Sequence, residues 1–154
     1  MKEDVKNFII GFTGPRVGMT EMQAELVKNV LRYAFNTGPV IGQHGDCIGA
    51  DAQFDQLCVE MDIDTMCRPC TIASQRAYTA ARIIAPPEHP LSRNKKIVET
   101  SSLMVSTPST EVDELRSGTW STIRHAQRIN APIIIITPSM KTLSNIRIIQ
   151  ELYA

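Results

Sequence analysis

LMVSTPSTEVDELRSGTWSTIRHAQRINAPIIIIT, residues 103–137, is the segment from which the fold class can be inferred. It begins with the apolar run 103–106, which predicts a short strand, and continues into an amphipathic stretch at 119–130, which predicts a helix. It ends with residues 132–137, a nearly pure β-branched run that is typical of a central parallel strand. A strand, a helix and a second strand in this order predict a right-handed βαβ crossover.

The same alternation of strands and helices continues on both sides of this segment. The other predicted strands are 7–12, 40–42 and 63–66. The other predicted helices are 20–36, one that follows residue 51 and runs to about 61, a short one at 74–81, 92–101, and an amphipathic tail at 143–153. Thr20 and Gln23 have the spacing of a capping box at the start of the first helix. We therefore predict an α/β fold: a Rossmann-like, doubly wound, mainly parallel sheet in a single domain, residues 1–154.

Length and charge narrow the class of function. The 154 residues are enough for one domain with a continuous core. Sixteen Lys and Arg residues balance sixteen Asp and Glu residues, which disfavours nonspecific binding to a long polyanion and makes nucleic acid an unexpected partner. The polar start of the chain lacks the apolar core of a signal peptide, and no apolar run approaches the length of a membrane span. We expect a cytoplasmic protein that binds a small molecule.

Four cysteines, Cys47, Cys58, Cys67 and Cys70, are expected to be free thiols in that compartment. Cys67 and Cys70 have the CxxC spacing of metal and redox sites, and His44 could add a nitrogen ligand. No second CxxC pair with matching spacing is present. Redox CxxC pairs normally lie at the start of a helix, whereas Pro69 lies just after a predicted strand. We therefore predict no bound metal and no cofactor.

The connection between residues 68 and 91 is long and contains four prolines. A connection of this length in a small domain is usually functional, often as a lid or binding loop.

Three polar loops that contain glycine follow predicted strands, at 13–16, 44–51 and 116–122. Ligands of doubly wound sheets bind beyond the carboxyl ends of the strands, so we expect these loops to converge on one crevice, with Arg93 and Asn94 nearby. The predicted ligand-binding residues are Thr13, Gly14, Arg16, His44, Gly45, Asp46, Gly49, Ala50, Asp51, Arg93, Asn94, Ser117, Gly118, Thr119, Trp120, Ser121 and Thr122.

The loop before the predicted helix at 119–130 has the chemistry of a phosphate site. Backbone N–H groups at a helix start are unpaired, Gly118 allows close approach, and the neighbouring hydroxyls can donate or cap the helix. Arg16 suits bidentate phosphate binding, and Asp46 or Asp51 could accept hydrogen bonds from a ribose or a base edge. Simpler alternatives are an ordinary helix cap, an Asp51 that only braces its loop, and a Trp120 that packs instead of stacking on a base. Neither a Walker A motif nor GxGxxG is present.

Taken together, the segments His44–Asp51, Arg93–Asn94 and Arg116–Trp120 resemble the SLOG superfamily of Rossmann-like proteins, which contains DprA/Smf and the LOG enzymes. The resemblance covers about residues 8–138, and the sequence GDCIGAD is similar to that of a bacterial and phage branch. LOG-like enzymes cleave the N-glycosidic bond of nucleoside 5′-monophosphates with an arginine and with the glutamate of a PGGxGTxxE loop. The resemblance implies that Arg93 is that arginine and Gly118-Thr119 the Gly-Thr, but Thr122 occupies the position of the glutamate.

These observations lead to three hypotheses. The first is a sensor or sequestering protein that binds a nucleotide or a nucleotide-derived signal. The second is a LOG-like phosphoribohydrolase in which Arg93 acts with Glu111, Glu114 or Asp46 in place of the missing glutamate. The third, implied by the resemblance to DprA, is single-stranded DNA binding, which the zero net charge disfavours. We also expect a homodimer or higher homo-oligomer, with an interface on the apolar face of the tail that contains Ile146, Ile149 and Leu152.

Overall fold

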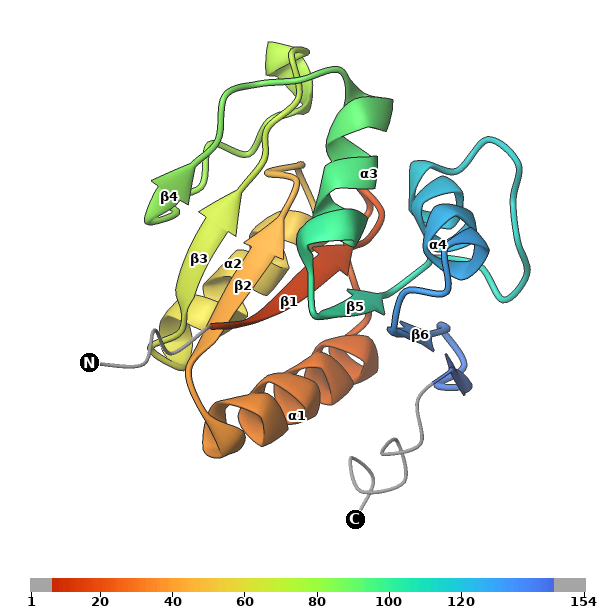
Figure 1. The fold of residues 1–154 in the computed structure, drawn as a ribbon. Coiled ribbons are helices and arrows are strands. Elements are labelled where there is room, and N and C mark those ends of the chain that lie inside the picture. The colour runs from red at the N-terminus through yellow and green to blue at the C-terminus, as the bar shows by residue number, and fades with distance from the viewer. Residues whose placement is uncertain (1–6, 146–154) are drawn as a thin grey trace.

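The computed structural model describes residues 7–145, which form one seven-stranded sheet with helices on both faces (Figure 1). The strands are β1 (Phe8–Thr13), β2 (Val40–His44), β3 (Asp64–Cys67), β4 (Ile83–Ile84), β5 (Leu103–Ser106), β6 (Ile133–Ile136) and β7 (Thr142–Ser144). The helices are α1 (Glu21–Thr37), α2 (Ala50–Glu60), α3 (Pro90–Thr100) and α4 (Gly118–Arg128), with a short 3-10 helix, η1 (Ala73–Gln75).

The strand order is β4-β3-β2-β1-β5-β6-β7, and every neighbouring pair is parallel except β6 and β7. The chain moves outward from β1 to β4 and then returns to the other side of β1 to form β5. The order therefore reverses between β1 and β5, and ligands of open α/β sheets bind at such a reversal.

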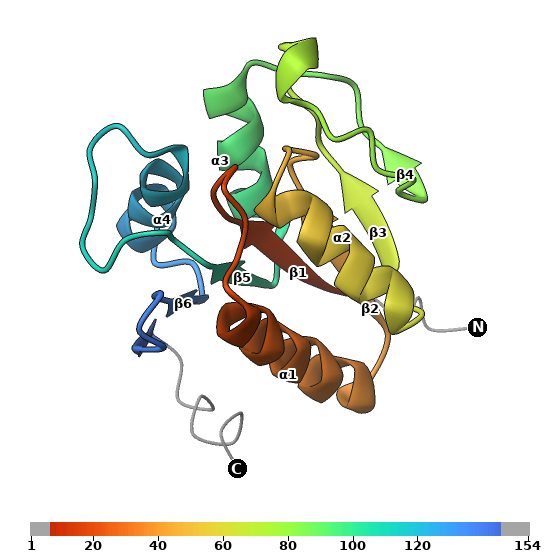
Figure 2. The ribbon, with the colours of Figure 1, turned by 180° about the vertical axis from the view of Figure 1, so that it is seen from behind.

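The helices cover the sheet in two layers, with α1 and α2 on one face and α3 and α4 on the other (Figures 1 and 2). The four isoleucines of β6 alternate between these layers. Ile134 and Ile136 belong to the core under α1 and α2, whereas Ile133 and Ile135 belong to the core under α3 and α4. A strand that is buried on both faces needs such a continuous apolar run. The predicted α/β fold with a mainly parallel sheet is confirmed.

The capping box predicted for the first helix is also present. The Thr20 hydroxyl accepts a hydrogen bond from Gln23 N at 3.0 Å, and Gln23 Oε1 accepts one from Thr20 N at 2.9 Å. The Gln23 amide nitrogen also donates to the carbonyls of Pro108 and Ile136 across the sheet. A single residue thus fixes both the start of α1 and its position beside β5 and β6.

The short helix predicted at 74–81 is wrong beyond its first turn. Only residues 73–75 are helical, as η1, because the following backbone bonds to the loop between β2 and α2. Ala77 N donates to Asp46 O at 2.7 Å, and Ile48 N donates to Gln75 O at 3.1 Å. These contacts outweigh the local helical pattern.

The helix predicted for the tail is wrong at its start, where Leu143 lies in β7 and pairs with Ile135 of β6. The rest of that segment, with the proposed interface residues Ile146, Ile149 and Leu152, lies outside the described residues. Self-association therefore stays a prediction, and light scattering would test it. Within residues 7–145, no helix has both the length and the apolar character that crossing a bilayer requires.

Candidate functional site

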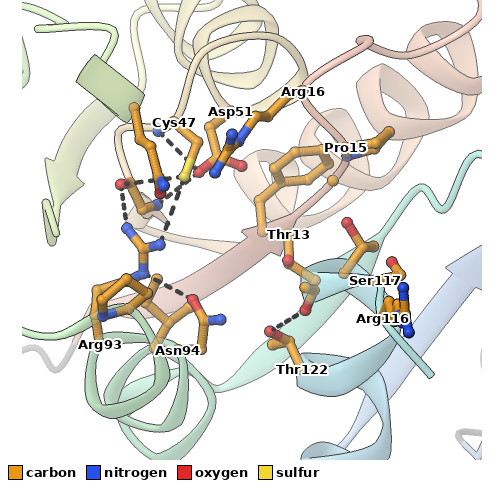
Figure 3. A pocket seen from close by; sticks show the side chains of 18 residues that line it. Thr13, Pro15, Arg16, Cys47, Asp51, Arg93, Asn94, Arg116, Ser117 and Thr122 are labelled. Atoms are coloured by element: carbon orange, nitrogen blue, oxygen red, sulfur yellow. Dashed lines mark hydrogen bonds between the residues drawn. The ribbon is translucent and has the colours of Figure 1, made fainter. Parts of the chain in front are cut away.

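A cavity of about 440 Å³ lies at the carboxyl ends of the parallel strands (Figure 3). The structure brings all three predicted loops together around it, and it adds Arg93 and Asn94 from α3. The residues that line the cavity are Phe12, Thr13, Gly14, Pro15, Arg16, Gly45, Cys47, Asp51, Gln75, Pro90, Arg93, Asn94, Ile97, Arg116, Ser117, Gly118, Thr119 and Thr122.

One wall of the cavity is the amino end of α4. The Ser117 side chain caps the helix by accepting a hydrogen bond from Trp120 N at 3.1 Å. Within residues 7–145, no hydrogen bond uses the backbone N–H of Gly118 or Thr119. A Cβ built on Gly118 would meet nothing within 4 Å. This helix end therefore presents unpaired donors and a positive dipole to open space.

The opposite wall is the loop from Gly45 to Asp51, which the Asp51 carboxylate closes on itself. Its Oδ2 accepts hydrogen bonds from Gly45 N at 3.0 Å and from Cys47 N at 3.2 Å. Asp51 is only 4% exposed. Burial raises its pKa above the ordinary value, although nearby His44, the amide hydrogen bonds and Arg93 act in the opposite direction.

Arg93 holds this loop in place from α3. The side chain is 4% exposed, and its Nη1 donates to Gly45 O at 2.5 Å and to Arg68 O at 3.2 Å. Its Nη2 contacts Cys47 Sγ at 3.5 Å, and its Nε donates to Asn94 Oδ1 at 2.7 Å. Most of the guanidinium donors are therefore committed to the protein. Gly45 permits this packing, because a Cβ there would lie 2.7 Å from Arg93 Nη1.

The Cys47 thiol lies in the cavity wall beside this guanidinium. Its burial, together with the nearby Asp51 carboxylate, raises its pKa to about 12, and the effect of Arg93 is too small to reverse the shift. At neutral pH the thiol is therefore protonated and uncharged. All four cysteines are free. Within residues 7–145, no group of three or more His, Cys, Asp or Glu side chains is arranged to hold a metal ion.

Asp46 and His44, which the sequence placed in the site, lie behind the cavity wall. Asp46 is fully buried and accepts hydrogen bonds from Arg76 Nε at 2.9 Å and from both the backbone and the hydroxyl of Thr79. His44 accepts from Asp46 N through Nδ1 at 2.9 Å and faces Asp55 Oδ1 through Nε2 at 2.8 Å. Asp46 thereby fixes the long proline-rich connection against the Gly45–Asp51 loop.

The remaining predicted residues also lie outside the lining. A Cβ on Gly49 would lie 2.2 Å from Arg16 O, so this glycine allows two backbones to pack together. Trp120 is 6% exposed and donates through Nε1 to Thr110 Oγ1 at 2.8 Å, which is the packing alternative. Ala50 is fully buried, and Ser121 is half-buried within α4.

None of the three carboxylates suggested as replacements for the missing glutamate lines the cavity. Asp46 is enclosed as described, Glu114 is exposed, and Glu111 accepts hydrogen bonds from the backbone and hydroxyl of Ser139 on the surface. Thr122 does line the cavity, but its hydroxyl donates to Gly118 O at 3.0 Å within α4. Among the described lining residues, Asp51 is the sole carboxylate.

Gln75 lines the cavity but was not predicted from the sequence. It comes from the long connection, whose length and prolines indicated a binding loop without marking a residue. Arg116 and Cys47 lie within predicted loops, although neither was among the predicted ligand-binding residues. Pro15, Pro90, Phe12 and Ile97 carry no chemical signal that could have marked them.

No protein-family model matches this chain, and no curated protein matches it. Among solved structures, the molybdenum cofactor binding protein of the phototrophic bacterium Rippkaea orientalis aligns with 98% of this chain and 85% of its own, with a TM-score of 0.68 and 18% identity. The Moco carrier protein of Chlamydomonas reinhardtii aligns with 86% of this chain and 78% of its own, with a TM-score of 0.65 and 17% identity. The DNA processing protein DprA of Streptococcus pneumoniae aligns with 84% of this chain and 50% of its own, with a TM-score of 0.62 and 15% identity.

At these identities the likeness concerns the fold. The chain shares its Rossmann-like fold with these proteins, DprA among them, so the resemblance inferred from the sequence is confirmed at the level of the fold.

Proposed function

We propose that this protein binds a nucleotide or a nucleotide-derived small molecule, with the phosphate of the ligand at the amino end of α4. The observation that carries the proposal is the open space around Gly118. No side chain or backbone surrounds it closely enough to require a glycine, yet it begins a helix whose first amides are unpaired and face the cavity. A glycine in open space beside unpaired N–H groups is expected where a phosphate approaches the backbone.

The rest of the cavity supports an anionic ligand of nucleotide size. Arg16 and Arg116 line it, and Figure 3 shows the Arg16 side chain reaching from the β1–α1 turn toward the side where Asp51 lies. The hydroxyl of Thr13 adds a further polar group. The volume of about 440 Å³ lies within the range of small-molecule sites, roughly 300–1,000 Å³.

The site supports binding better than cleavage of a glycosidic bond. Such cleavage uses a carboxylate to stabilise an oxocarbenium-like transition state or to activate water. Thr122 cannot do this, and the one lining carboxylate, Asp51, has an oxygen committed to two backbone amides. We therefore place sensing or sequestration ahead of hydrolysis.

A thermal-shift screen with isothermal titration of the hits tests the proposal. The panel contains nucleoside mono-, di- and triphosphates, cyclic nucleotides, ADP-ribose-type compounds and, because of the carrier-type structural neighbours, the molybdenum cofactor. A ligand at a hundred times its Kd should stabilise the protein by about 2.7 kcal/mol. Each hit is then incubated with the protein and assayed for free base, and a short single-stranded oligonucleotide is titrated at low salt.

Gly118→Val provides the matched variant, since its side chain would enter the space that the phosphate needs. We expect a folded protein with no measurable nucleotide binding. Stabilisation of the wild type without release of base supports a sensor or sequestering protein, whereas release of base would make it a hydrolase. Normal nucleotide binding by Gly118→Val would contradict the proposed anion site.

A further inference from the structure

The two aspartates of the Gly45–Asp51 loop differ in how many of their carboxylate oxygens accept hydrogen bonds from the protein. Both oxygens of Asp46 are occupied, by Arg76 on one side and by the amide and hydroxyl of Thr79 on the other. Asp51 uses only Oδ2, for the amides of Gly45 and Cys47. Within residues 7–145, no hydrogen bond reaches Asp51 Oδ1, and Asp51 lines the cavity whereas Asp46 does not.

A ligand that fills the cavity displaces the water that can solvate Asp51 Oδ1. A buried carboxylate oxygen without a donor is strongly unfavourable, so the ligand itself has to supply an N–H or O–H group at this point. The neighbouring Cys47 thiol carries no charge at neutral pH, and Asp51 provides the sole carboxyl group among the described lining residues.

The phosphate of the ligand cannot take this position. The oxygens of an ionised phosphate only accept hydrogen bonds, so they cannot supply the donor that Asp51 Oδ1 lacks. Arg93, the buried cation nearby, already donates to Gly45, Arg68 and Asn94 and contacts Cys47. Ser117 and Thr122, at the amino end of α4, lie on the other side of the cavity from Asp51 (Figure 3). The two ends of the cavity therefore differ in chemistry: α4 offers hydrogen-bond donors for an anion, and Asp51 offers an acceptor.

The geometry points to Asp51 as the residue that selects the ligand at the end opposite its phosphate, an inference that rests on the proposed function. Asp51 Oδ1 accepts a hydrogen bond from a neutral N–H or O–H donor, supplied by an exocyclic amine of the base or by a ribose hydroxyl. The site accordingly favours nucleoside 5′-monophosphates with that donor and disfavours nucleotides with a second phosphate on the ribose.

Pairs of ligands that differ by one donor test this inference on the unmodified protein. Isothermal titration compares AMP with purine riboside 5′-monophosphate, GMP with IMP, and AMP with its 2′-deoxy and 3′-deoxy forms. Loss of the donor that faces Asp51 should weaken binding about tenfold to a hundredfold, and the pair concerned identifies the source as base or ribose. Adenosine 3′,5′-bisphosphate should bind more weakly than AMP.

Asp51→Asn completes a double-mutant cycle with the same ligands. The amide oxygen of Asn can still accept from the loop amides, and a melting curve establishes that the variant is folded. In this variant the discriminating pair should differ by less than about twofold. Glu114→Gln, which removes an exposed carboxylate outside the cavity, should keep the wild-type discrimination.

Each possible outcome bears on a separate claim. Equal affinity within every ligand pair for the wild-type protein, discrimination that persists in Asp51→Asn, or tight binding of the bisphosphate would overturn the role of Asp51 and leave nucleotide binding intact. If no nucleotide binds the wild type, or if Gly118→Val binds normally, the proposed function fails and this inference fails with it.

Discussion

Two helices of this protein begin in the same way in the sequence and differently in space. Both α2 and α4 follow a parallel strand, and each has a glycine at its amino end: Gly49 is the N-cap of α2, and Gly118 is the first residue of α4. At α2 the turn after β1 covers the first residues: Ala50 N donates to Pro15 O at 3.0 Å, and Gly49 packs against the backbone of Arg16. At α4 the first two amides are unpaired within the described residues and belong to Gly118 and Thr119, which line the cavity.

The comparison shows that a glycine at the start of a helix has two unrelated uses. Gly49 has a φ of +93° and no room for a Cβ, so the fold requires it. Gly118 has free space around it, so the fold does not. Gly49 therefore serves backbone packing, whereas Gly118 leaves the amino end of α4 open to the cavity that it lines. Substitutions that separate these two uses are expected to have effects that range from large to small.

Gly49→Ala should destabilise the fold severely. The new methyl group would lie 2.2 Å from Arg16 O, and the residue would keep an unfavourable φ of +93°. We expect a loss of about 3 kcal/mol or more in the free energy of unfolding, from backbone strain and overpacking together. Urea unfolding measures it, with Gly118→Ala as the matched control. A loss below about 1 kcal/mol would contradict the close packing of Gly49 against Arg16.

Gly118→Ala should raise the stability of the fold and lower the affinity for the nucleotide. Alanine fits the space around residue 118 and reduces the freedom of the unfolded chain, so the stability should rise by about 0.4–1 kcal/mol. The affinity for the best nucleotide should fall about tenfold, because the methyl group holds the phosphate away from the amides. Urea unfolding and isothermal titration measure both. Unchanged affinity would contradict the claim that Gly118 allows a phosphate to approach the backbone of α4.

The sequence predicted the fold well because its signals are local and repeated. The β-branched run of β6, the capping box at Thr20 and the alternation of strands and helices each persist in the structure. The segment at 74–81 could not be predicted, since its conformation depends on hydrogen bonds to residues about 30 positions earlier. The same is true of Leu143, whose partner in β6 determines its strand conformation.

The candidate site was predictable as a set of loops but not residue by residue. Topology alone brings the loops to one edge of the sheet. Which aspartate of Gly45–Asp51 faces the cavity depends on Arg76 and Thr79, which reach Asp46 from the long connection. Nothing in the spacing of Asp46 and Asp51 distinguishes them.

Arg16→Ala sharpens the comparison, because Arg16 contributes to both helix ends through different atoms. Its backbone carbonyl packs against Gly49, and its side chain lines the cavity. Removing only the side chain should leave the urea midpoint unchanged and weaken nucleotide binding about threefold to tenfold, an effect that shrinks in high salt because the guanidinium is exposed. Arg32→Ala on α1 is the control. Equal affinity of both variants would exclude Arg16 from the site.

Asp51 allows a second comparison, because its side chain already accepts from the amides of Gly45 and Cys47, whereas the first amides of α4 have no partner within the described residues. Burial raises the folded-state pKa of Asp51 above its ordinary value of 3.8, so its ionised form costs stability at neutral pH. As the pH falls through that raised pKa the carboxyl becomes protonated, and the cost disappears by the time the pH is below 3.8. Asp51→Asn should therefore be more stable than the wild type at pH 7, and this gain should vanish under acid conditions.

Urea unfolding at several pH values from 7 to below 3.8 measures this difference, with Glu114→Gln, which removes an exposed carboxylate, as the control that should follow the wild type. A variant that is less stable at pH 7 would mean that the bonds from Gly45 and Cys47 to an ionised Asp51 outweigh its burial. A more stable variant that has lost ligand discrimination would show that the carboxylate is retained for binding at the expense of the fold.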